Sequence, residues 1–326
     1  MTVFIDRVAS RLGIEGGLGT ILLMLAAVLP AVWLTHPAIG LAGGAVCALV
    51  LGKNPLANST RYAKLSLQTA IVLLGLTMNT AALLALSASF SGAVTAYVLS
   101  CLAVGWLLSR LLRVDPITGS LLTLGTAICG GTAIAACAPF FKADAARLGV
   151  ALGAVFLLNM VALFAFPPLA EWMALSELEF GAFAALAVHD TSSVVATAAV
   201  YGEEAAEVAT TVKLGRTLWL VPIVILLGIW KNGERGKAVL SRARVPGFVL
   251  AFIAATVVAT LLPLPADVLS LIKSISKTLL VLALFFVGLE LTRETLGRLG
   301  GREGVFALAI WVVMVPIAYG LVQAVV

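Results

Sequence analysis

Two adjacent glycines interrupt a stretch of sequence that is hydrophobic enough to cross a bilayer. Gly130 and Gly131 lie in the middle of residues 119–141, with the hydroxyls of Thr126 and Thr132 beside them. Glycine weakens a helix, and a backbone that opens within hydrocarbon survives only where it lines a cavity or is buried in protein. Secondary transporters bind their solutes at broken segments of this kind. The pattern therefore predicts transport of a small polar solute.

A second apolar segment, residues 180–201, is interrupted by five consecutive polar residues, which are His189, Asp190, Thr191, Ser192 and Ser193. Placing His and Asp in hydrocarbon is costly, so such residues usually face a cavity or each other. His189 is one of only two histidines, and a histidine can change charge near neutral pH. We interpret this cluster as part of a substrate site or as a proton-coupling site. The alternative is a structural hydrogen bond from His189 or Asp190 to a neighbouring backbone break.

Two cations follow within the next apolar segment. Lys213 and Arg216 are three residues apart, so on a helix they share one face, with Thr217 adjacent. Two cations beside broken, hydroxyl-rich helices suit an anion. The alternatives are that these side chains reach the membrane interface, or that they form an ion pair with Asp190 or Glu290.

Further polar residues lie inside apolar segments. Asn79 and Glu290 each come shortly after a Gly-Leu pair, where they would cap a helix end or contribute to ion coupling. Gln68 and Asn159 are typical of side chains that hydrogen-bond one membrane helix to another. The candidates for ion coupling are therefore His189, Asp190, Asn79 and Glu290, and the alternative for Glu290 is a position at the cytoplasmic interface beside Arg293.

No catalytic signature stands out. HExxH, GxSxG and Walker-type motifs are absent from the sequence, and two histidines exclude a multi-histidine metal site. We predict no catalytic residues, no metal ligands and no cofactor, with H+ or Na+ as a coupling ion. A membrane-embedded enzyme that uses Cys129 with His189 is kept as a rival.

Composition defines the class of protein. The 326 residues are 61% hydrophobic and 11% charged, whereas a soluble domain carries roughly a quarter charged residues. The mean hydropathy is +1.11. Apolar segments, each near the ~20 residues that a bilayer requires, recur at about residues 18–34, 37–52, 65–88, 94–110, 119–141, 146–167, 180–201, 206–230, 246–263, 268–290 and 304–325. We predict an all-α polytopic membrane protein with about 9–11 transmembrane segments.

The net charge of +5 does not indicate a nucleic-acid partner, because the basic residues lie in short loops, as the positive-inside rule expects. The four cysteines lie in apolar segments without a CxxC pair, which is typical of reduced thiols; they are Cys47, Cys101, Cys129 and Cys137. The apolar run after Arg7 and Arg11 has no cleavage site of the signal-peptide type, so we predict that it is the first transmembrane helix.

Loop charge also predicts topology. With a cytoplasmic N-terminus, four basic loops fall in the cytoplasm, and their cations are Lys53, Arg61 and Lys64; Arg110 and Arg113; Lys231, Arg235, Lys237, Arg242 and Arg244; and Arg293, Arg298 and Arg302. Two arrangements stay open for residues 119–141 and 180–201. If both segments span, Lys142 and Arg147 lie outside. If both are re-entrant hairpins, Lys142 and Arg147 lie inside, and we favour this second arrangement.

Internal repetition agrees with the hairpins. Residues 64–76 align without gaps on residues 277–289, and residues 128–134 align more weakly on residues 188–194. In the hairpin arrangement both pairs run in opposite directions, as inverted repeats require. We predict one transmembrane transporter domain over residues 1–326, with inverted-repeat halves at about residues 18–167 and 180–325.

These motifs resemble the YeiH-type sulfate exporter family of bacterial inner-membrane proteins. The resemblance covers the chain from about residue 20 onward and is carried by five elements, which are Cys129-Gly-Gly-Thr-Ala-Ile-Ala-Ala-Cys-Ala-Pro, Val188-His-Asp, Ala209-Thr-Thr-Val-Lys-Leu-Gly-Arg, Pro222 and Val245-Pro-Gly-Phe-Val-Leu-Ala-Phe. It implies a fold of the cation:proton antiporter and anion transporter superfamily, with inverted repeats and discontinuous helices. Thr191, Ser192 and Ser193 depart from the family pattern, which puts the substrate preference in doubt. Sulfate is a family label that no residue here singles out.

We therefore expect a secondary active transporter, an exporter of a small anion of the sulfate, sulfonate or carboxylate class, in a bacterial inner membrane. The expected substrate-binding residues are Cys129, Gly130, Gly131, Thr132, His189, Asp190, Thr191, Ser192, Ser193, Lys213 and Arg216. The expected partners are the solute and the lipid bilayer, and a homodimer is compatible with such folds. The rivals are a cation:proton antiporter that uses Asp190, a channel and the membrane enzyme.

Overall fold

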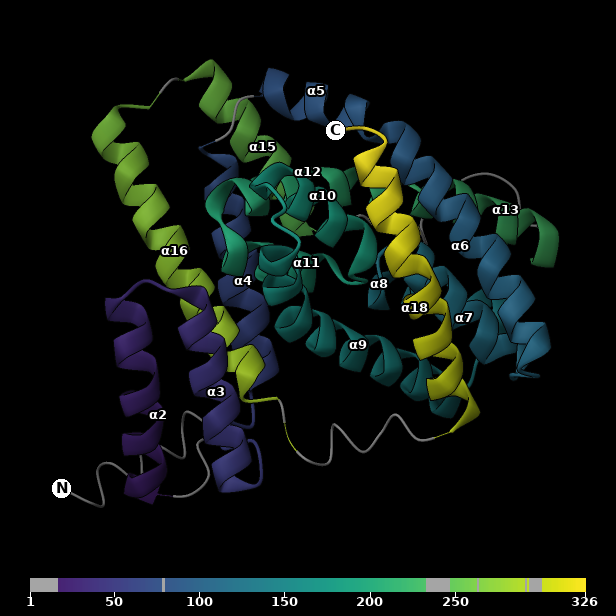
Figure 1. The fold of residues 1–326 in the computed structure, drawn as a ribbon, viewed down its shortest axis with the longest axis horizontal. Coiled ribbons are helices and arrows are strands. Elements are labelled where there is room, and N and C mark those ends of the chain that lie inside the picture. Colours follow the sequence, from purple (N-terminus) through teal and green to yellow (C-terminus); the bar gives the residue numbers. More distant parts are fainter. Residues whose placement is uncertain (1–16, 78–79, 233–246, 263, 291, 293–300) are drawn as a thin grey trace. The chain divides into compact units, whose positions relative to one another are not determined.

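A computed structural model describes residues 17–77, 80–232, 247–262, 264–290, 292 and 301–326 (Figure 1). The regular elements in these ranges are α2 Gly17–Trp33, α3 Pro37–Leu51, α4 Ser59–Gly75, α5 Thr80–Ser89, α6 Ser91–Leu111, α7 Pro116–Ala127, α8 Gly131–Cys137, the 3-10 turn η1 Ala138–Phe141, α9 Ala145–Trp172, α10 Glu177–Ala187, α11 Thr191–Tyr201, α12 Glu203–Leu218, α13 Leu220–Asn232, α15 Gly247–Leu261, α16 Ala266–Gly288 and α18 Arg302–Gln323.

Five helical stretches are long and apolar enough to cross a membrane, and they are Ser91–Leu111, Ala146–Trp172, Glu203–Trp230, Ala266–Gly288 and Arg302–Gln323. Several shorter apolar helices accompany them. The predicted all-α polytopic membrane protein is confirmed. One predicted segment, residues 65–88, is divided in the structure, because α4 ends at Gly75 and α5 begins at Thr80.

The chain forms two compact units, and each is discontinuous in sequence. Unit 1 comprises residues 1–79 and 250–297, and unit 2 comprises residues 80–249 and 298–326. This division does not test the predicted repeat halves, which stay a prediction. The hairpin segments and the cation pair all belong to unit 2.

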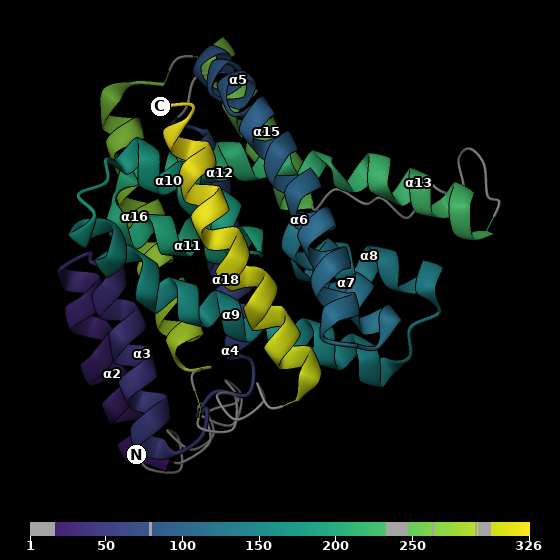
Figure 2. The same cartoon turned by 45° about the vertical axis from the view of Figure 1, so that its right-hand side comes forward.

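In unit 1, helices α2, α3 and α4 pack with α16 (Figure 2). Small residues bring α3 and α16 into backbone contact, since a Cβ on Gly40 would lie 2.6 Å from the carbonyl oxygen of Val281. Gly44 faces Phe285 in the same way, and Gly288 faces Leu41. Close approach through glycine is a common way for membrane helices to associate.

Helices α4 and α16 of unit 1 are antiparallel. Glu290, just beyond the C-terminus of α16, accepts hydrogen bonds from Ser59 and Thr60 at the start of α4. Further along the pair, the Ser276 hydroxyl donates to the carbonyl oxygen of Ala70 over 3.0 Å. The two segments aligned in the sequence, residues 64–76 and 277–289, therefore run in opposite directions, as predicted.

In unit 2, residues 116–141 turn back on themselves; we call this segment hairpin 1. Its first arm is α7, and its second arm is α8 with η1. A Cβ on Gly125 would lie 2.9 Å from the side chain of Ile134, so the arms lie side by side. Asp115, just before the first arm, forms an ion pair of 3.0 Å with Arg147, just after the second. Both ends of hairpin 1 therefore lie together, at what we call its mouth.

Residues 177–201 form hairpin 2, with α10 and α11 as its arms. The Tyr201 hydroxyl, at the end of α11, donates to the carbonyl oxygen of Leu175, just before α10. The rings of Phe180 and Tyr201 have centroids 4.4 Å apart. Glu177 also accepts a 3.1 Å hydrogen bond from the amide of Ala205, at the start of α12. The two ends of hairpin 2 therefore also lie together, and we call them its mouth.

Helix α9 connects the two mouths. Its 28 residues span about 42 Å, so the mouths lie at opposite ends of this long helix. The mouth of hairpin 1 is flanked by Arg113, Lys142 and Arg147, and that of hairpin 2 by acidic residues such as Glu171 and Glu179. Each of the two segments is a hairpin whose ends lie together, and Lys142 and Arg147 lie at the same end of α9 as Arg113. That the hairpins are re-entrant in the membrane stays a prediction.

Candidate functional site

The tips of the two hairpins touch. The tip of hairpin 1 is residues 128–130, and the tip of hairpin 2 is residues 188–190. Gly130 has φ +61°, and a Cβ there would lie 3.1 Å from the amide nitrogen of Asp190 and 3.2 Å from the carbonyl carbon of His189. Both the backbone conformation and the close approach favour glycine. The two breaks that the sequence singled out therefore meet.

Arg216 of α12 joins the ends of both first arms. Its side chain is 0% exposed. Its guanidinium donates to backbone carbonyl oxygens, which belong to Thr126 and Ala127 of α7 (Nε to Ala127, 2.9 Å) and to Ala185 (3.0 Å), Leu186 (2.7 Å) and Val188 (3.2 Å) of hairpin 2. The last carbonyls of a helix have no partner within the helix and carry the negative end of its dipole. Arg216 supplies both the missing donors and the opposite charge.

Lys213 lies on the same face of α12, one turn earlier, and it is also 0% exposed. Its Nζ donates to the carbonyl oxygen of Val188 over 2.8 Å. The predicted shared face of Lys213 and Arg216 is confirmed, and their burial excludes a position at the membrane interface. Both cations donate to backbone carbonyl oxygens, and no ion pair joins either of them to the Asp190 carboxylate within the described part of unit 2. An ammonium has three N–H donors, and this is its one hydrogen bond within the described ranges.

The second arms begin at the tips and present hydroxyl groups. Asp190 caps α11, because its carboxylate accepts hydrogen bonds from the amides of Ser192 (3.0 Å) and Ser193 (3.4 Å). The hydroxyls of Ser192, Ser193 and Thr132 are half-buried and make no hydrogen bond to any residue that the structure describes. Thr191 is buried. That these residues bind a solute stays a prediction.

His189 is held by α9. Its amide donates to Asn159 Oδ1 over 3.0 Å, and its Nδ1 lies 3.3 Å from the same oxygen. Asn159 therefore links two elements, as its position inside a membrane helix predicted. His189 Nε2 is buried without a hydrogen-bond partner among the described residues. The proton-coupling role of His189 stays a prediction.

Three residues near the tips were missed in the sequence. The Tyr97 ring lies 4.7 Å from the Arg216 guanidinium, and its hydroxyl is buried without a partner in the described part of the chain. Trp311 Nε1 donates to the carbonyl oxygen of Ala187 over 2.9 Å, at the end of α10. Cys101 is buried near Tyr97. Single aromatic residues in apolar segments give no pattern that would reveal these contacts.

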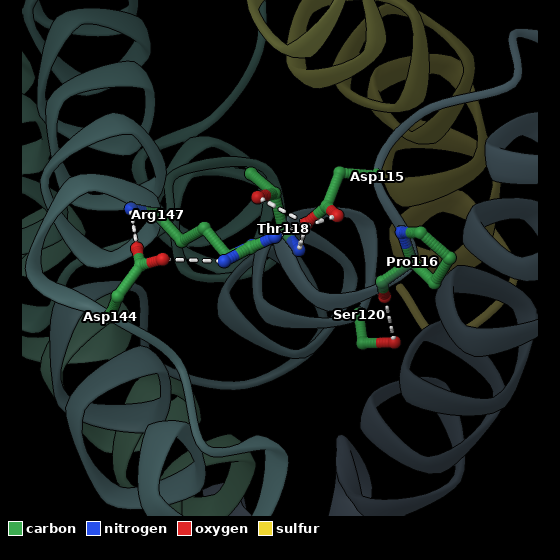
Figure 3. Close-up of polar contacts among 6 residues, drawn as sticks. All are labelled: Asp115, Pro116, Thr118, Ser120, Asp144 and Arg147. Atoms are coloured by element: carbon green, nitrogen blue, oxygen red, sulfur yellow. Dashed lines mark hydrogen bonds and ion pairs between the residues drawn. The ribbon is translucent and has the colours of Figure 1, made fainter.

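Figure 3 shows the mouth of hairpin 1, where Arg147 bridges two N-cap carboxylates. Asp115 caps α7 by accepting from the amide of Thr118 over 2.9 Å, and Asp144 caps α9. The hydrogen bond from the Arg147 side chain, with that from the Thr118 backbone, lowers the pKa of Asp115 to about 2. This cluster fixes where the hairpin begins and ends.

The remaining predicted residues are placed as follows. Cys129 is buried at the tip of hairpin 1, and Gly131, the first residue of α8, is half-buried. Glu290 belongs to unit 1, at the start of α4, and Asn79 lies outside the described residues, as do Arg7, Arg11 and most of the basic loop after Lys231. The four cysteines are free and buried. No group of three or more His, Cys, Asp and Glu side chains suited to a metal ion occurs within the described ranges.

Comparison with known proteins gives the family. The family model described as Conserved hypothetical protein 698 matches residues 19–307. A UPF0324 membrane protein of Porphyromonas gingivalis is 40% identical over 286 residues, which cover 86% of this chain and 85% of the relative. This chain belongs to the UPF0324 membrane-protein family.

Other UPF0324 relatives match the chain over a similar length. One from Bdellovibrio bacteriovorus is 37% identical over 281 residues, covering 86% of each chain. One from Vibrio vulnificus is 37% identical over 285 residues, covering 86% of this chain and 90% of the relative. No solved structure matches the chain. The names of these relatives describe a membrane protein and specify neither a substrate nor sulfate export.

Proposed function

We propose that this UPF0324 protein is a secondary transporter that moves a small anion across the bacterial inner membrane by alternating access. The observation that carries the proposal is the Lys213 ammonium. It is fully buried at the contact between two hairpin tips, with one carbonyl acceptor for its three donors. A buried cation that lacks a carboxylate partner favours a negatively charged solute.

The surroundings of Lys213 support the same conclusion. The half-buried hydroxyls of Thr132, Ser192 and Ser193 lie in the first turns of the two second arms, and hydroxyl donors suit the oxygens of a sulfonate, a carboxylate or a related anion. Backbone that is broken and buried in protein near the middle of a membrane domain is typical of transporter sites.

Arg216 contributes to this proposal in a different way from Lys213. Its donors already bind five carbonyl oxygens of the two first arms. Its role is to hold the tips together and to supply a fixed positive charge, while Lys213 contacts the anion. The positive-inside rule places the basic mouth of hairpin 1 in the cytoplasm, and export is the direction that the sequence resemblance suggests.

The test is a thermal-shift screen of purified protein against sulfate, sulfite, sulfonates, small carboxylates, sodium and pH. We expect saturable stabilisation by one class of anion. Lys213→Gln should abolish it, whereas Lys142→Gln, which neutralises a lysine at the mouth of hairpin 1, should leave it unchanged. Stabilisation by sodium or a pH step alone would replace this proposal with a cation:proton antiporter that uses Asp190.

A further inference from the structure

We infer that Asn159 is a positioning residue for His189. It keeps a hydrogen on Nδ1 of the histidine ring and so reserves Nε2 for the transported solute. This inference rests on the proposed function and deepens it, because it adds a second solute contact to that of Lys213. The observation that carries it is a pair of hydrogen bonds at one oxygen, Asn159 Oδ1, from the backbone and from the ring of the same histidine.

The backbone hydrogen bond fixes which way the Asn159 amide faces. The amide nitrogen of His189 lies 3.0 Å from the Asn159 side chain, and a backbone N–H can only donate. The atom that faces it is therefore Oδ1, because Nδ2 would bring two donors together. Asn159 is 4% exposed, so protein atoms rather than bulk water decide this orientation.

The same oxygen fixes the histidine ring. Nδ1 of His189 lies 3.3 Å from Asn159 Oδ1, and an amide oxygen can only accept. Nδ1 therefore carries a hydrogen, in the neutral ring as well as in the charged one. Because the hydrogen bond of one ring nitrogen sets the role of the other, Nε2 is the ring nitrogen that is open to a further partner.

The ring contact goes beyond what a structural link requires. The backbone hydrogen bond alone would hold the tip of hairpin 2 against α9. The contact with Nδ1 adds nothing to the path of the backbone, but it determines the orientation of the ring and the nitrogen that carries the hydrogen. Asn159 therefore acts on the chemistry of His189 as well as on its position.

His189 lies between two contacts of the hairpin tips. Val188, which precedes it, accepts the 2.8 Å hydrogen bond of Lys213, and Asp190, which follows it, lies against Gly130. Nε2 of His189 is buried without a hydrogen-bond partner among the described residues. The large majority of buried polar side-chain atoms are hydrogen-bonded, so an open one calls for an explanation. A solute held by Lys213 would supply the partner.

The experiment observes the two ring nitrogens by NMR of the full chain in lipid. The sequence has two histidines, so His36→Gln leaves His189 as the single one. His36 is exposed, and this change should leave the fold intact. One sample is isotope-labelled at Nδ1 of histidine and a second sample at Nε2. Without any added anion, we expect the N–H signal at Nδ1.

Variants of Asn159 test whether this residue is the cause. Asn159→Leu removes the oxygen at similar volume and should lose the N–H signal at Nδ1. Asn159→Asp retains an oxygen that accepts both hydrogen bonds and should keep the signal. Gln68→Leu is the matched control, because it also replaces an amide by leucine in an apolar helix, α4 of unit 1, and should leave both nitrogens unchanged.

Added anions test the contact at Nε2. Methanesulfonate, formate and sulfate are titrated into the labelled samples and, in parallel, into a thermal-shift assay. An anion that stabilises the protein should shift the Nε2 signal while Nδ1 keeps its hydrogen. In Asn159→Leu the affinity for that anion should fall about threefold to tenfold, as expected for one misplaced hydrogen-bond partner.

The outcomes separate this inference from the proposed function. A wild-type ring without a hydrogen on Nδ1 overturns the inference, and so does an Asn159→Leu protein that keeps the N–H signal there. An anion that stabilises the protein without shifting the Nε2 signal overturns the solute contact and leaves the transporter intact. A wild type that no anion stabilises contradicts the proposed function and the solute contact together, whereas the Nδ1 signal tests Asn159 separately.

Discussion

Gly130 lies against the backbone of Asp190, with its α-carbon so close that an added Cβ would be 3.1 Å from the Asp190 amide. This contact joins two hairpins whose mouths lie at opposite ends of α9. It brings a glycine break and a polar break, 60 positions apart in the numbering, to one point. The contact between the tips therefore depends on one residue without a side chain.

Gly130→Ala tests this dependence. The positive φ and the contact with Asp190 should together destabilise the protein by about 1–3 kcal/mol. Gly149→Ala is the control, because a Cβ on this α9 glycine meets nothing within 4 Å and alanine should stabilise the helix by about 0.5–1 kcal/mol. Thermal unfolding of the two variants should shift in opposite directions. Equal shifts would show that the tips can separate at little cost.

Arg216→Ala should be far more damaging than the loss of an exposed arginine. Removing the guanidinium leaves five buried carbonyl groups of α7 and hairpin 2 without their donor, and we expect a loss of about 3–5 kcal/mol. Arg147→Ala at the mouth of hairpin 1, where the side chain is 39% exposed, should cost about 1 kcal/mol or less. The yield of monodisperse protein and its unfolding temperature measure both. An Arg216→Ala protein as stable as the wild type would show that Arg216 does not hold the two hairpins together.

The hairpins make a prediction about sidedness. In a chain whose four cysteines are replaced, a single cysteine at Lys142 and another at Glu171 should react with a membrane-impermeant reagent from opposite sides, since α9 separates the two positions. By the positive-inside rule, position 142 should react from the cytoplasm. Labelling of position 142 from outside and of position 171 from the cytoplasm would contradict the re-entrant arrangement, because that is the result expected if both hairpin segments span the membrane.

Asp115 should make stability sensitive to acid. Its pKa is about 2 in the folded protein against an ordinary value of 3.8, so the Arg147 contact stabilises the fold above about pH 4. That stabilisation is lost as the pH falls from about 4 toward 2. Unfolding temperatures at pH 7 and pH 3 should therefore differ more for the wild type than for Asp115→Asn. Asp267→Asn, on an exposed carboxylate of α16, should behave like the wild type. If Asp115→Asn lost as much stability between pH 7 and pH 3 as the wild type, the contact between Asp115 and Arg147 would not be the cause of that loss.

Much of the fold follows from patterns that act along the chain. Hydropathy identifies the apolar segments because each must match the bilayer on its own. The positive-inside rule favoured the hairpins because spanning segments would have left Lys142 and Arg147 on the unfavourable side. The division of residues 65–88 into α4 and α5 was not predicted, because hydropathy does not show where one helix ends and the next begins within an apolar segment.

The sequence predicted which residues come together at the hairpin tips better than it predicted the contacts that they make. Glycines 130 and 131, the cluster from His189 and the pair at Lys213 all disrupt an apolar background, so their types alone reveal them. The acceptors of Arg216 are backbone carbonyls, which every residue carries, and no sequence pattern indicates which ones a guanidinium will reach. The two aligned pairs also occur in opposite order along the chain, so a simple duplication does not account for both.

The short arms of the hairpins have an electrical consequence. Helix α7 measures about 18 Å, whereas α9 measures about 42 Å, so each tip is reached from its own surface through less than half the length of a full span. If an anion passes the contact between Gly130 and Asp190, it crosses the place where the least protein separates the two sides of the membrane. A net charge moved through the membrane potential changes energy by about 2.3 kcal/mol per 100 mV. Transport of a monovalent anion alone through this contact should therefore generate a current that depends on voltage, and co-transport of one proton in the same direction should abolish that current.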